Sequence, residues 1–221
     1  MISSHVADEK GARRVQLRRI LRVSDGLVDP TKSPWSDMPL IAPNHIESGT
    51  GRLVEAVDSA VEQSAISGKG YVRAGQLIYS KIRPALNKLV IAPSDCLCSA
   101  DMYPLIVNQS IVVTHFLLYA MLDQAFVDQA VMVSERVAMP KVNRETLAGL
   151  VIPLPRIERQ KEVVAHLDSS TAHIDSTIDA AYASITLMQE RRSALVSAAV
   201  TGRIDPRTGQ ESTPEMVLEP A

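Results

Sequence analysis

The sequence has 221 residues and a formal net charge of −2, with 46% hydrophobic and 22% charged residues. These values allow one globular domain with a hydrophobic core, plus an extended element. No apolar run reaches the length of about 18 residues that a membrane span needs, and no apolar stretch follows the N-terminal charges as in a secretory signal. We therefore expect a cytoplasmic protein without a membrane partner.

Cys96 and Cys98 are the only cysteines in the chain. Separated by one residue on an expected strand, they would point to the same side, which is a poor geometry for a disulfide. A zinc site would need a second pair at a suitable spacing, and the sequence has none. We interpret both as buried structural thiols, and we expect neither a metal nor another cofactor.

The charges are distributed unevenly, although the net charge by itself does not favour a nucleic-acid partner. The segment from Gln63 to Ser94 contains five basic residues and no acidic residue. A second basic cluster lies near the start of the chain: Lys10, Arg13, Arg14, Arg18, Arg19 and Arg22. Such asymmetry allows a basic face on a nominally acidic protein, while a solvated surface of mixed charge is the alternative.

In chain order, residues 1–13 are expected to form a disordered leader and residues 14–153 a compact mixed domain. Short apolar runs separated by Pro, Gly, Asn and Asp predict several strands. These runs are residues 38–42, 76–79, 88–91 and 103–107. Glycines predict turns at 49–51 and at 68–70.

The second half of this domain carries a helical pattern. Residues 115–131 show apolar side chains at helical spacing and predict one helix. Asn143 to Thr146 are expected to open a short turn into residues 147–152. The fold class expected from these elements is α+β, with a long helix following the globular domain.

The most informative pattern is an apolar register that runs for about five heptads near the C-terminus. Spacings of three and four alternate along it, which is typical of a coiled coil with one narrow seam facing a partner helix. The seam consists of Val164, Leu167, Thr171, Ile174, Ile178, Ala181, Ile185, Met188, Arg192, Leu195 and Ala199. Only Thr171 and Arg192 are polar, and either is a candidate for fixing the register of the pairing.

A single helix over residues 154–202 would be far longer than the average helix of about 11 residues. Pro153 and Pro155 fix its starting direction, and Gly202 is suited to end it. Residues 203–221 have too little apolar content to fold alone, and we expect a flexible tail.

The segment from Pro153 to Asp205 resembles the conserved spacer helix of type I restriction–modification specificity subunits. The resemblance is carried by a proline-rich start, by Glu158 and Gln160, and by the ending Thr-Gly-Arg-Ile-Asp at 201–205. The Arg-Arg-Ser-Ala-Leu element at 191–195 matches as well. Arg159 stands between Glu158 and Gln160, which the family usually has side by side.

The preceding domain is similar to a target recognition domain of the same family, through residues 39–46, 75–84 and 98–104. Members of the family usually carry two recognition domains and two helices, whereas this chain has one of each. The resemblance implies a half subunit that pairs through its helix, as a homodimer or with another specificity chain, and reads a bipartite double-stranded DNA site. It also implies methyltransferase subunits as partners, with a restriction nuclease subunit as a further candidate.

DNA contacts are expected on the globular domain, where lysine and arginine bind phosphates and bidentate side chains read bases. Lys81 and Arg83 would project from one face of a strand or its end, and Pro84 would turn the chain there. Asn87 would supply an amide suited to adenine. The full set of candidates is Lys81, Arg83, Lys88, Asn87, Lys69, Tyr71, Arg73, Asn44 and His45, and Arg136 and Lys141 are weaker phosphate candidates.

No motif indicates catalysis by the chain itself. An adenine-methyltransferase Asn-Pro-Pro-aromatic motif, a glycine-rich cofactor loop and a phosphate-binding loop are all missing from the sequence. We therefore expect a non-enzymatic specificity subunit with no catalytic residues. A coiled-coil adaptor without DNA binding is the alternative function, and an enzyme of unknown type is a third.

Overall fold

A computed structural model describes residues 13–134 and 140–204. The chain divides into two compact units, Met1–Ala165 and His166–Ala221. The first unit ends later than the predicted domain boundary at residue 153, because the start of the long helix packs on the globular core. Most of the predicted leader and tail lies outside the described residues, but Arg13 already belongs to a strand.

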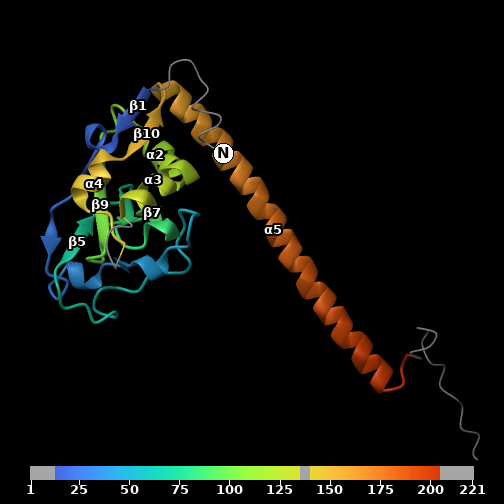
Figure 1. The fold of residues 1–221 in the computed structure, drawn as a ribbon. Coiled ribbons are helices and arrows are strands. Elements are labelled where there is room, and N and C mark those ends of the chain that lie inside the picture. The colour runs from blue at the N-terminus through green and yellow to red at the C-terminus, as the bar shows by residue number, and fades with distance from the viewer. Residues whose placement is uncertain (1–12, 135–139, 205–221) are drawn as a thin grey trace, which may run out of the picture. The chain divides into compact units, whose positions relative to one another are not determined.

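The described elements confirm the α+β class (Figure 1). Four strands lie within one residue or two of their predicted positions, at β4, β6, β7 and β9. In chain order the elements are β1 (Arg13–Gln16), η1 (Leu17–Arg19), β2 (Leu21–Val23), β3 (Leu27–Val28), η2 (Trp35–Asp37), β4 (Leu40–Ile41), η3 (Pro43–His45), β5 (Lys69–Val72), β6 (Leu77–Ser80), η4 (Pro84–Leu86), β7 (Leu89–Ile91), β8 (Cys96–Cys98), β9 (Met102–Val107), α2 (Thr114–Leu122), α3 (Gln124–Ser134), α4 (Arg144–Gly149), β10 (Val151–Leu154) and α5 (Ile157–Val200).

The strands form two four-stranded sheets and one two-stranded ribbon. The first sheet has the order β2-β9-β6-β7 and the second the order β3-β5-β8-β4, while β1 pairs with β10. Among the described strands, β4 and β8 form the parallel pair and the other pairs are antiparallel.

The core of the globular unit is layered, and β6 shows why. Successive side chains of a strand point to opposite faces. Leu77 and Tyr79 face a cluster that includes helices α2 and α3, whereas Ile78 faces a second cluster against the other sheet. Both faces of β6 are therefore covered, and this explains its continuous apolar sequence.

The same alternation positions the two cysteines on β8. Cys96 and Cys98 face the cluster between the sheets, whereas Leu97 faces a third cluster on the outer side. Both thiols are buried and free. Burial raises the pKa of each thiol to about 12, so their interpretation as buried structural thiols is confirmed.

The prediction of a single helix over residues 115–131 is wrong. Two helices, α2 and α3, lie there instead, with an angle of 65° between them. The break falls at Asp123, whose backbone is extended at φ −64 and ψ 140. Its carboxylate accepts a hydrogen bond from the backbone N–H of Ala125 at 3.0 Å. Asp123 thus caps the start of α3 in the way that short acidic side chains do.

The turn predicted at residues 68–70 is also wrong, because Lys69 and Gly70 belong to β5. A Cβ atom on Gly70 would lie 2.9 Å from Cys98 Sγ and 3.0 Å from Pro104 Cγ. The glycine therefore allows close packing between the sheets rather than a turn. The turn at 49–51 is confirmed, since Gly49 and Gly51 have φ values of 74° and 77°.

The first turn of α5 is anchored by Gln160, which is fully buried. Its amide donates to the backbone carbonyls of Pro155 and Ile111 at 2.9 and 3.1 Å. Its carbonyl accepts from the N–H of Val113 at 2.8 Å. A buried glutamine with all these partners satisfied fixes the start of the helix to the globular core.

The 44 residues of α5 confirm the predicted long helix. Its end follows the expected glycine cap: Gly202 has φ 71°, and the N–H groups of Arg203 and Gly202 donate to the carbonyls of Ala198 and Ala199. This pattern satisfies carbonyls that the helix end would leave unpaired. No single helix among the described residues has the length and apolar character to cross a membrane, and only the bent α2–α3 pair reaches that threshold, by length and composition alone.

Candidate nucleic-acid interface

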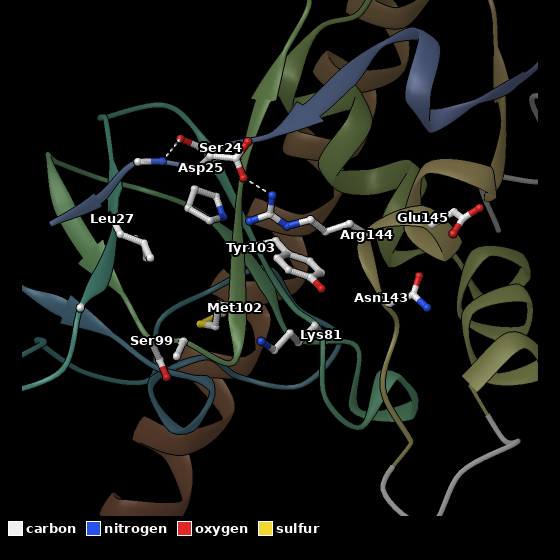
Figure 2. Close-up of a pocket in the computed structure, with 15 residues that line it drawn as sticks. Ser24, Asp25, Leu27, Lys81, Ser99, Met102, Tyr103, Asn143, Arg144 and Glu145 are labelled. Atoms are coloured by element: carbon white, nitrogen blue, oxygen red, sulfur yellow. Dashed lines mark hydrogen bonds and ion pairs between the residues drawn. The ribbon is translucent and has the colours of Figure 1, made fainter.

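A cavity of about 700 Å³ lies in the globular unit, and we name it the Tyr103 cleft (Figure 2). Residues from β3, β5, β9, α4 and the connections between strands form its walls. The residues that line it are Ser24, Asp25, Gly26, Leu27, Gly68, Gly70, Lys81, Ser99, Ala100, Met102, Tyr103, Pro104, Asn143, Arg144 and Glu145.

Two cationic side chains form cation–π contacts with the aromatic ring of Tyr103 in this cleft. Lys81 Nζ lies 5.5 Å from the centre of the Tyr103 ring, and Arg144 Cζ lies 5.9 Å from it. Contacts of this kind attract a cation to the face of the ring. Burial raises the pKa of Tyr103, and the charge of Arg144 partly offsets that effect.

Lys81 is held in the cleft by backbone hydrogen bonds just beyond the end of β6. Its N–H donates to the carbonyl of Asp101 at 2.9 Å, and its carbonyl accepts from the N–H of Val142 at 2.8 Å. These bonds tie the lysine to the segments before β9 and before α4. Its side chain is half-buried, so the position of the ammonium group is constrained.

Arg144 begins α4 and forms an ion pair with Asp25 across the cleft. The preceding Asn143 caps the helix, since its Oδ1 accepts from the N–H of Thr146 at 2.7 Å. Figure 2 shows the guanidinium between Asp25 and the Tyr103 ring, with the Glu145 carboxylate turned away from this group. The cap fixes the backbone from which Arg144 reaches into the cleft.

Arg144 also lines a second, smaller cavity of about 290 Å³, which we name the basic groove. It includes Arg18 and Arg22 from the basic cluster near the start of the chain. The other lining residues are Leu21, Val23, Leu147 and Ala148. Arg144 is thus shared by two adjoining hollows, which together bring Lys81 and three arginines to one part of the surface.

Of the predicted contact residues, Lys81 lines the cleft whereas Arg83 does not. Both residues follow the end of β6, which is Ser80, as one of the two expected positions has it, but Arg83 has a left-handed backbone with φ 48°. Alternation along a strand therefore no longer relates the two side chains. Arg83 is exposed, and its role as a phosphate contact stays a prediction.

Asn87 is assigned to base reading by the sequence and has a structural role instead. It is only 6% exposed, has a left-handed backbone with φ 43°, and its amide donates to the carbonyl of Leu122 at 3.1 Å. A buried amide bonded to the backbone is not free to read a base. Lys88 beside it is half-buried and donates to the carbonyl of Pro43 at 2.7 Å.

Lys69, Tyr71 and Arg73 alternate with the buried Gly70 and Val72 along β5 and just beyond it. The hydroxyl of Tyr71 donates to Asp95 at 2.6 Å, and this bond is the main cause that lowers the pKa of the Asp95 carboxyl. The negative charge of the Asp95 carboxylate beside Tyr71 reduces the attraction of Lys69 and Arg73 for phosphate. These three residues do not line the Tyr103 cleft or the basic groove.

The remaining candidates lie elsewhere in the unit. Asn44 is exposed on η3, and His45 Nδ1 accepts from the N–H of Ala42 at 3.1 Å. Lys141 is exposed and its segment forms a bridge with Ile82, while Arg136 lies outside the described residues. Among the predicted contact residues that the structure describes, Lys81 is thus the one that lines the cleft, and the others lie elsewhere.

Sequence reasoning missed Tyr103, Arg144 and Asp25. Asn143 followed by a helical segment is a cap signal, and it marks Arg144 as the first helical residue. Nothing local in the sequence connects Asp25 with Arg144, because they are 119 positions apart. Within the described residues, no group of three or more His, Cys, Asp or Glu side chains is arranged to hold a metal ion.

The predicted seam can be followed along α5. Val164 packs with Val163 against the globular core, so this first seam position is already in use in its own unit. In the second unit Ile174, Ile178 and Ile185 remain 55%, 47% and 50% exposed. The remaining seam residues with large exposed apolar side chains are Met188 and Leu195.

Two further features modify the seam. Thr171 Oγ1 donates to the carbonyl of Leu167 at 2.9 Å, so its hydroxyl is satisfied within its own helix and is less suited to fixing register. Tyr182 and Val196 are 67% and 57% exposed. Each follows a seam position directly and widens the apolar stripe beyond a strict two-position repeat.

A family model and a similar protein of known function both connect this chain with type I restriction–modification systems. The family model described as the type I restriction modification DNA specificity domain matches residues 25–185. The EcoDI specificity subunit of a type I restriction enzyme from Escherichia coli is 40% identical over 136 residues, which are 62% of this chain and 30% of that protein.

Solved structures agree in fold. The HsdS subunit from Thermoanaerobacter tengcongensis matches with a TM-score of 0.65 and 20% identity, over 93% of this chain and 52% of that chain. A chain from a study of complex assembly and conformational transition of the type I R-M system gives a TM-score of 0.64, at the same identity and coverage. The chain therefore spans about half the length of these solved chains. By its match over residues 25–185, the chain belongs to the family of type I restriction modification DNA specificity domains.

Proposed function

We propose that this chain supplies DNA sequence recognition to a type I restriction–modification system, and that its globular unit binds double-stranded DNA along the basic groove and the Tyr103 cleft. The observation that carries the proposal is the gathering of Lys81, Arg144, Arg18 and Arg22 on two adjoining hollows of a specificity-family domain. Lysine and arginine neutralise backbone phosphates and release counterions. Groups deeper in the cleft meet base edges.

We further propose that the chain performs no chemistry and that methyl transfer belongs to partner subunits. The described walls of the Tyr103 cleft offer the cations Lys81 and Arg144, an aromatic ring and two carboxylates. Asp25 is paired with Arg144, and the Glu145 carboxylate is turned away from that pair in Figure 2. That set suits binding of a polyanion. Nucleophilic catalysis would instead need a nucleophile beside a base within hydrogen-bonding reach.

We propose that the apolar stripe of α5 pairs with the same stripe of a second copy of this chain. Ile174, Ile178 and Ile185 keep about half of their surface exposed, and removing that surface from water favours association. Two paired helices would set the distance between two recognition domains, and so between two DNA half-sites. Pairing with a different specificity chain is the alternative. Light scattering of the purified chain, together with co-purification of two differently tagged copies, distinguishes them, because only a homodimer gives the dimer mass and retains the second tag without another chain.

Methyltransferase subunits are the proposed partners of the completed assembly, with a restriction nuclease subunit as a further one. One of the solved chains similar in fold comes from work on complex assembly of the type I R-M system. The C-terminal part of α5 and the turn after it present exposed Arg191 and Arg203, which lie outside the seam, for such docking. Co-expression of the full chain with type I methyltransferase subunits, followed by co-purification, tests this, and failure of the folded chain to retain them contradicts it.

The DNA-binding proposal is tested by measuring the affinity of the full chain for duplex DNA over a series of salt concentrations. Log affinity should fall linearly with log salt concentration, because phosphate binding releases counterions. Lys81→Ala should reduce the magnitude of that slope by about 1 and weaken binding on all duplexes alike.

The matched control is Lys32→Ala, which removes the same charge from the same unit. Lys32 pairs with Asp29 at 3.3 Å and lies outside both hollows, so its loss should leave the slope unchanged. Affinity without salt dependence, or equal effects of the two substitutions, contradicts the proposal. A complete lack of DNA binding would favour the coiled-coil adaptor instead.

A further inference from the structure

Resting on the proposed DNA-binding function, we propose that Arg144 is the specificity-determining residue that reads a guanine of the target, and that Asp25 is the positioning residue that orients its guanidinium. The two cations of the Tyr103 cleft then have different roles. Lys81 binds phosphate, and Arg144 reads a base.

The backbone that carries Arg144 is fixed from two sides. The Asn143 cap at 2.7 Å holds the first turn of α4, and Leu147 of the same helix is fully buried in the main core. A reading side chain needs such a support, since a displacement of about 1 Å weakens a recognition site.

The guanidinium itself is held at two places. Asp25 accepts from Nη1, and the Tyr103 ring lies beneath the group with 5.9 Å between Cζ and the ring centre. The Arg144 side chain nevertheless remains 54% exposed. Because a guanidinium has five N–H donors, a single carboxylate contact leaves donors that can face a ligand.

Guanine is the base that matches these donors. Its O6 and N7 atoms accept two parallel hydrogen bonds from an arginine in the major groove. The planar fork of arginine makes this contact in a fixed geometry, whereas a lysine ammonium such as that of Lys81 can reach the same atoms only as a rotatable point charge. The different chemistry of the two cations therefore separates base reading from phosphate binding.

Asp25 needs an explanation of its own, because its carboxylate is 79% exposed beside a surface meant for phosphate. An acid at this place lowers the local attraction for DNA. Orientation of Arg144 accounts for it, since a carboxylate that fixes one edge of the guanidinium directs the other edge outward. Glu145 does not compete for this task, because its carboxylate is turned away in Figure 2.

The test begins with selection of duplexes from a randomised pool by the wild-type full chain. Affinity is then measured for the selected duplex, for versions with each guanine replaced by adenine, and for an unrelated duplex. Arg144→Lys keeps the charge and removes the fork. We expect discrimination at one guanine to fall several-fold, because lysine still reaches O6 or N7 but without the fixed fork, with the salt slope and the affinity for the unrelated duplex unchanged. Arg144→Ala removes both the charge and the donors, and there we expect the same discrimination to fall from about 10–100-fold to near unity.

Asp25→Asn keeps the shape and removes the charge. We expect discrimination at the same guanine to fall several-fold, while the unrelated duplex binds as tightly as before or more tightly. Asp25→Glu should restore part of the discrimination, because it restores the carboxylate. A purely structural or repulsive role of Asp25 would not change the preference for one base.

Three results overturn the inference, and they are distinguishable. If Arg144→Ala keeps its discrimination at every guanine, Arg144 is not the reader. If Asp25→Asn tightens the selected and unrelated duplexes equally, Asp25 only repels DNA. If the wild-type chain selects no sequence and shows no salt-dependent binding, the proposed function itself fails. Urea unfolding followed through the fluorescence of Trp35, the single tryptophan of the chain, controls for folding of each variant.

Discussion

The two units of this protein treat their apolar side chains in opposite ways. In the globular unit Leu77, Ile78 and Leu105 are completely buried. In the second unit Ile178 and Met188 remain 47% and 69% exposed, although they are of similar size and chemistry. The first unit closes its own core, whereas the helix of the second unit leaves an apolar stripe exposed, and exposed stripes of this kind are typical of interaction surfaces.

This difference follows from how each unit uses its backbone. The central strands β6 and β8 are covered on both faces by other elements of the same unit, so their apolar residues find neighbours there. A single helix has no second layer, and most of its stability in proteins comes from packing of its apolar face. The comparison predicts that substitutions in the two units affect different measurements.

The largest expected effect comes from the seam. Ile178→Asp combined with Ile185→Asp places charges at two half-exposed apolar positions. Burial of one isoleucine side chain contributes about 1.5–3 kcal/mol, so self-association should weaken by at least about 100-fold. Sedimentation equilibrium measures the association, and the unfolding midpoint of the globular unit should stay constant.

Leu187→Asp is the matched control for the seam. Leu187 is 65% exposed on the same helix but lies outside the repeat of three and four, so the same change there should leave association nearly unaltered. Equal weakening by the control and the seam variant would show that the apolar stripe does not mediate pairing.

A smaller effect, restricted to the other unit, is expected from Gln160→Leu. The substitution leaves the N–H of Val113 and the carbonyls of Ile111 and Pro155 without their present partner. Buried polar groups left unpaired cost about 1–3 kcal/mol each. Because Ile111 is 41% exposed and water can reach it, the two remaining groups give an expected loss of about 2–6 kcal/mol in the free energy of unfolding. Urea unfolding through Trp35 fluorescence measures it.

The neighbouring Lys161 is exposed, and Lys161→Ala should change the free energy of unfolding by less than about 0.5 kcal/mol. Pairing through the seam should persist in both variants at concentrations where the globular unit is folded. A Gln160→Leu variant as stable as the wild type would mean that the buried amide bonds contribute little.

The smallest expected effect is a pH dependence that belongs to the globular unit. Burial raises the pKa of Cys96 and Cys98 from 9.0 to about 12. Because the folded pKa lies above the unfolded one, stability is complete below pH 9 and is lost as the pH rises toward 12. Between pH 8 and 10 we expect a loss of about 1–3 kcal/mol in the free energy of unfolding.

The double variant Cys96→Ala/Cys98→Ala separates this contribution from other alkaline effects. It should be less stable than the wild type at pH 8 but should lose less stability between pH 8 and 10. An equal fall in both proteins would mean that the thiols do not titrate on unfolding in this range. The seam contains no cysteine, so the thiols should not contribute to any change in pairing.

Sequence patterns predicted well those elements whose conformation depends mainly on residues that are neighbours in the sequence. The strands near Leu40, Leu77, Leu89 and Met102 and the end of α5 at Gly202 follow from short apolar runs and a glycine cap. The helix break at Asp123 was missed because the apolar periodicity continues through it. The capping bond to Ala125 becomes visible only in the folded chain.

The contact residues were harder to predict, since a basic side chain looks the same in a sequence whether it is free or engaged. Asn87 is buried by its contact with Leu122, which is 35 positions away. Lys88 reaches the carbonyl of Pro43, 45 positions away. Such distant partners cannot be read from residue type or spacing.

The sequence by itself determined the long helix, its glycine end and its apolar stripe, because helical periodicity and capping act over a few neighbouring residues. The tertiary structure decided which charges meet. Asp25, Lys81, Tyr103 and Arg144 come from four separate parts of the chain, and sheet pairing together with the packing of α4 brings them to one cleft. The proposed recognition chemistry depends on the distances between those groups, and only folding sets those distances.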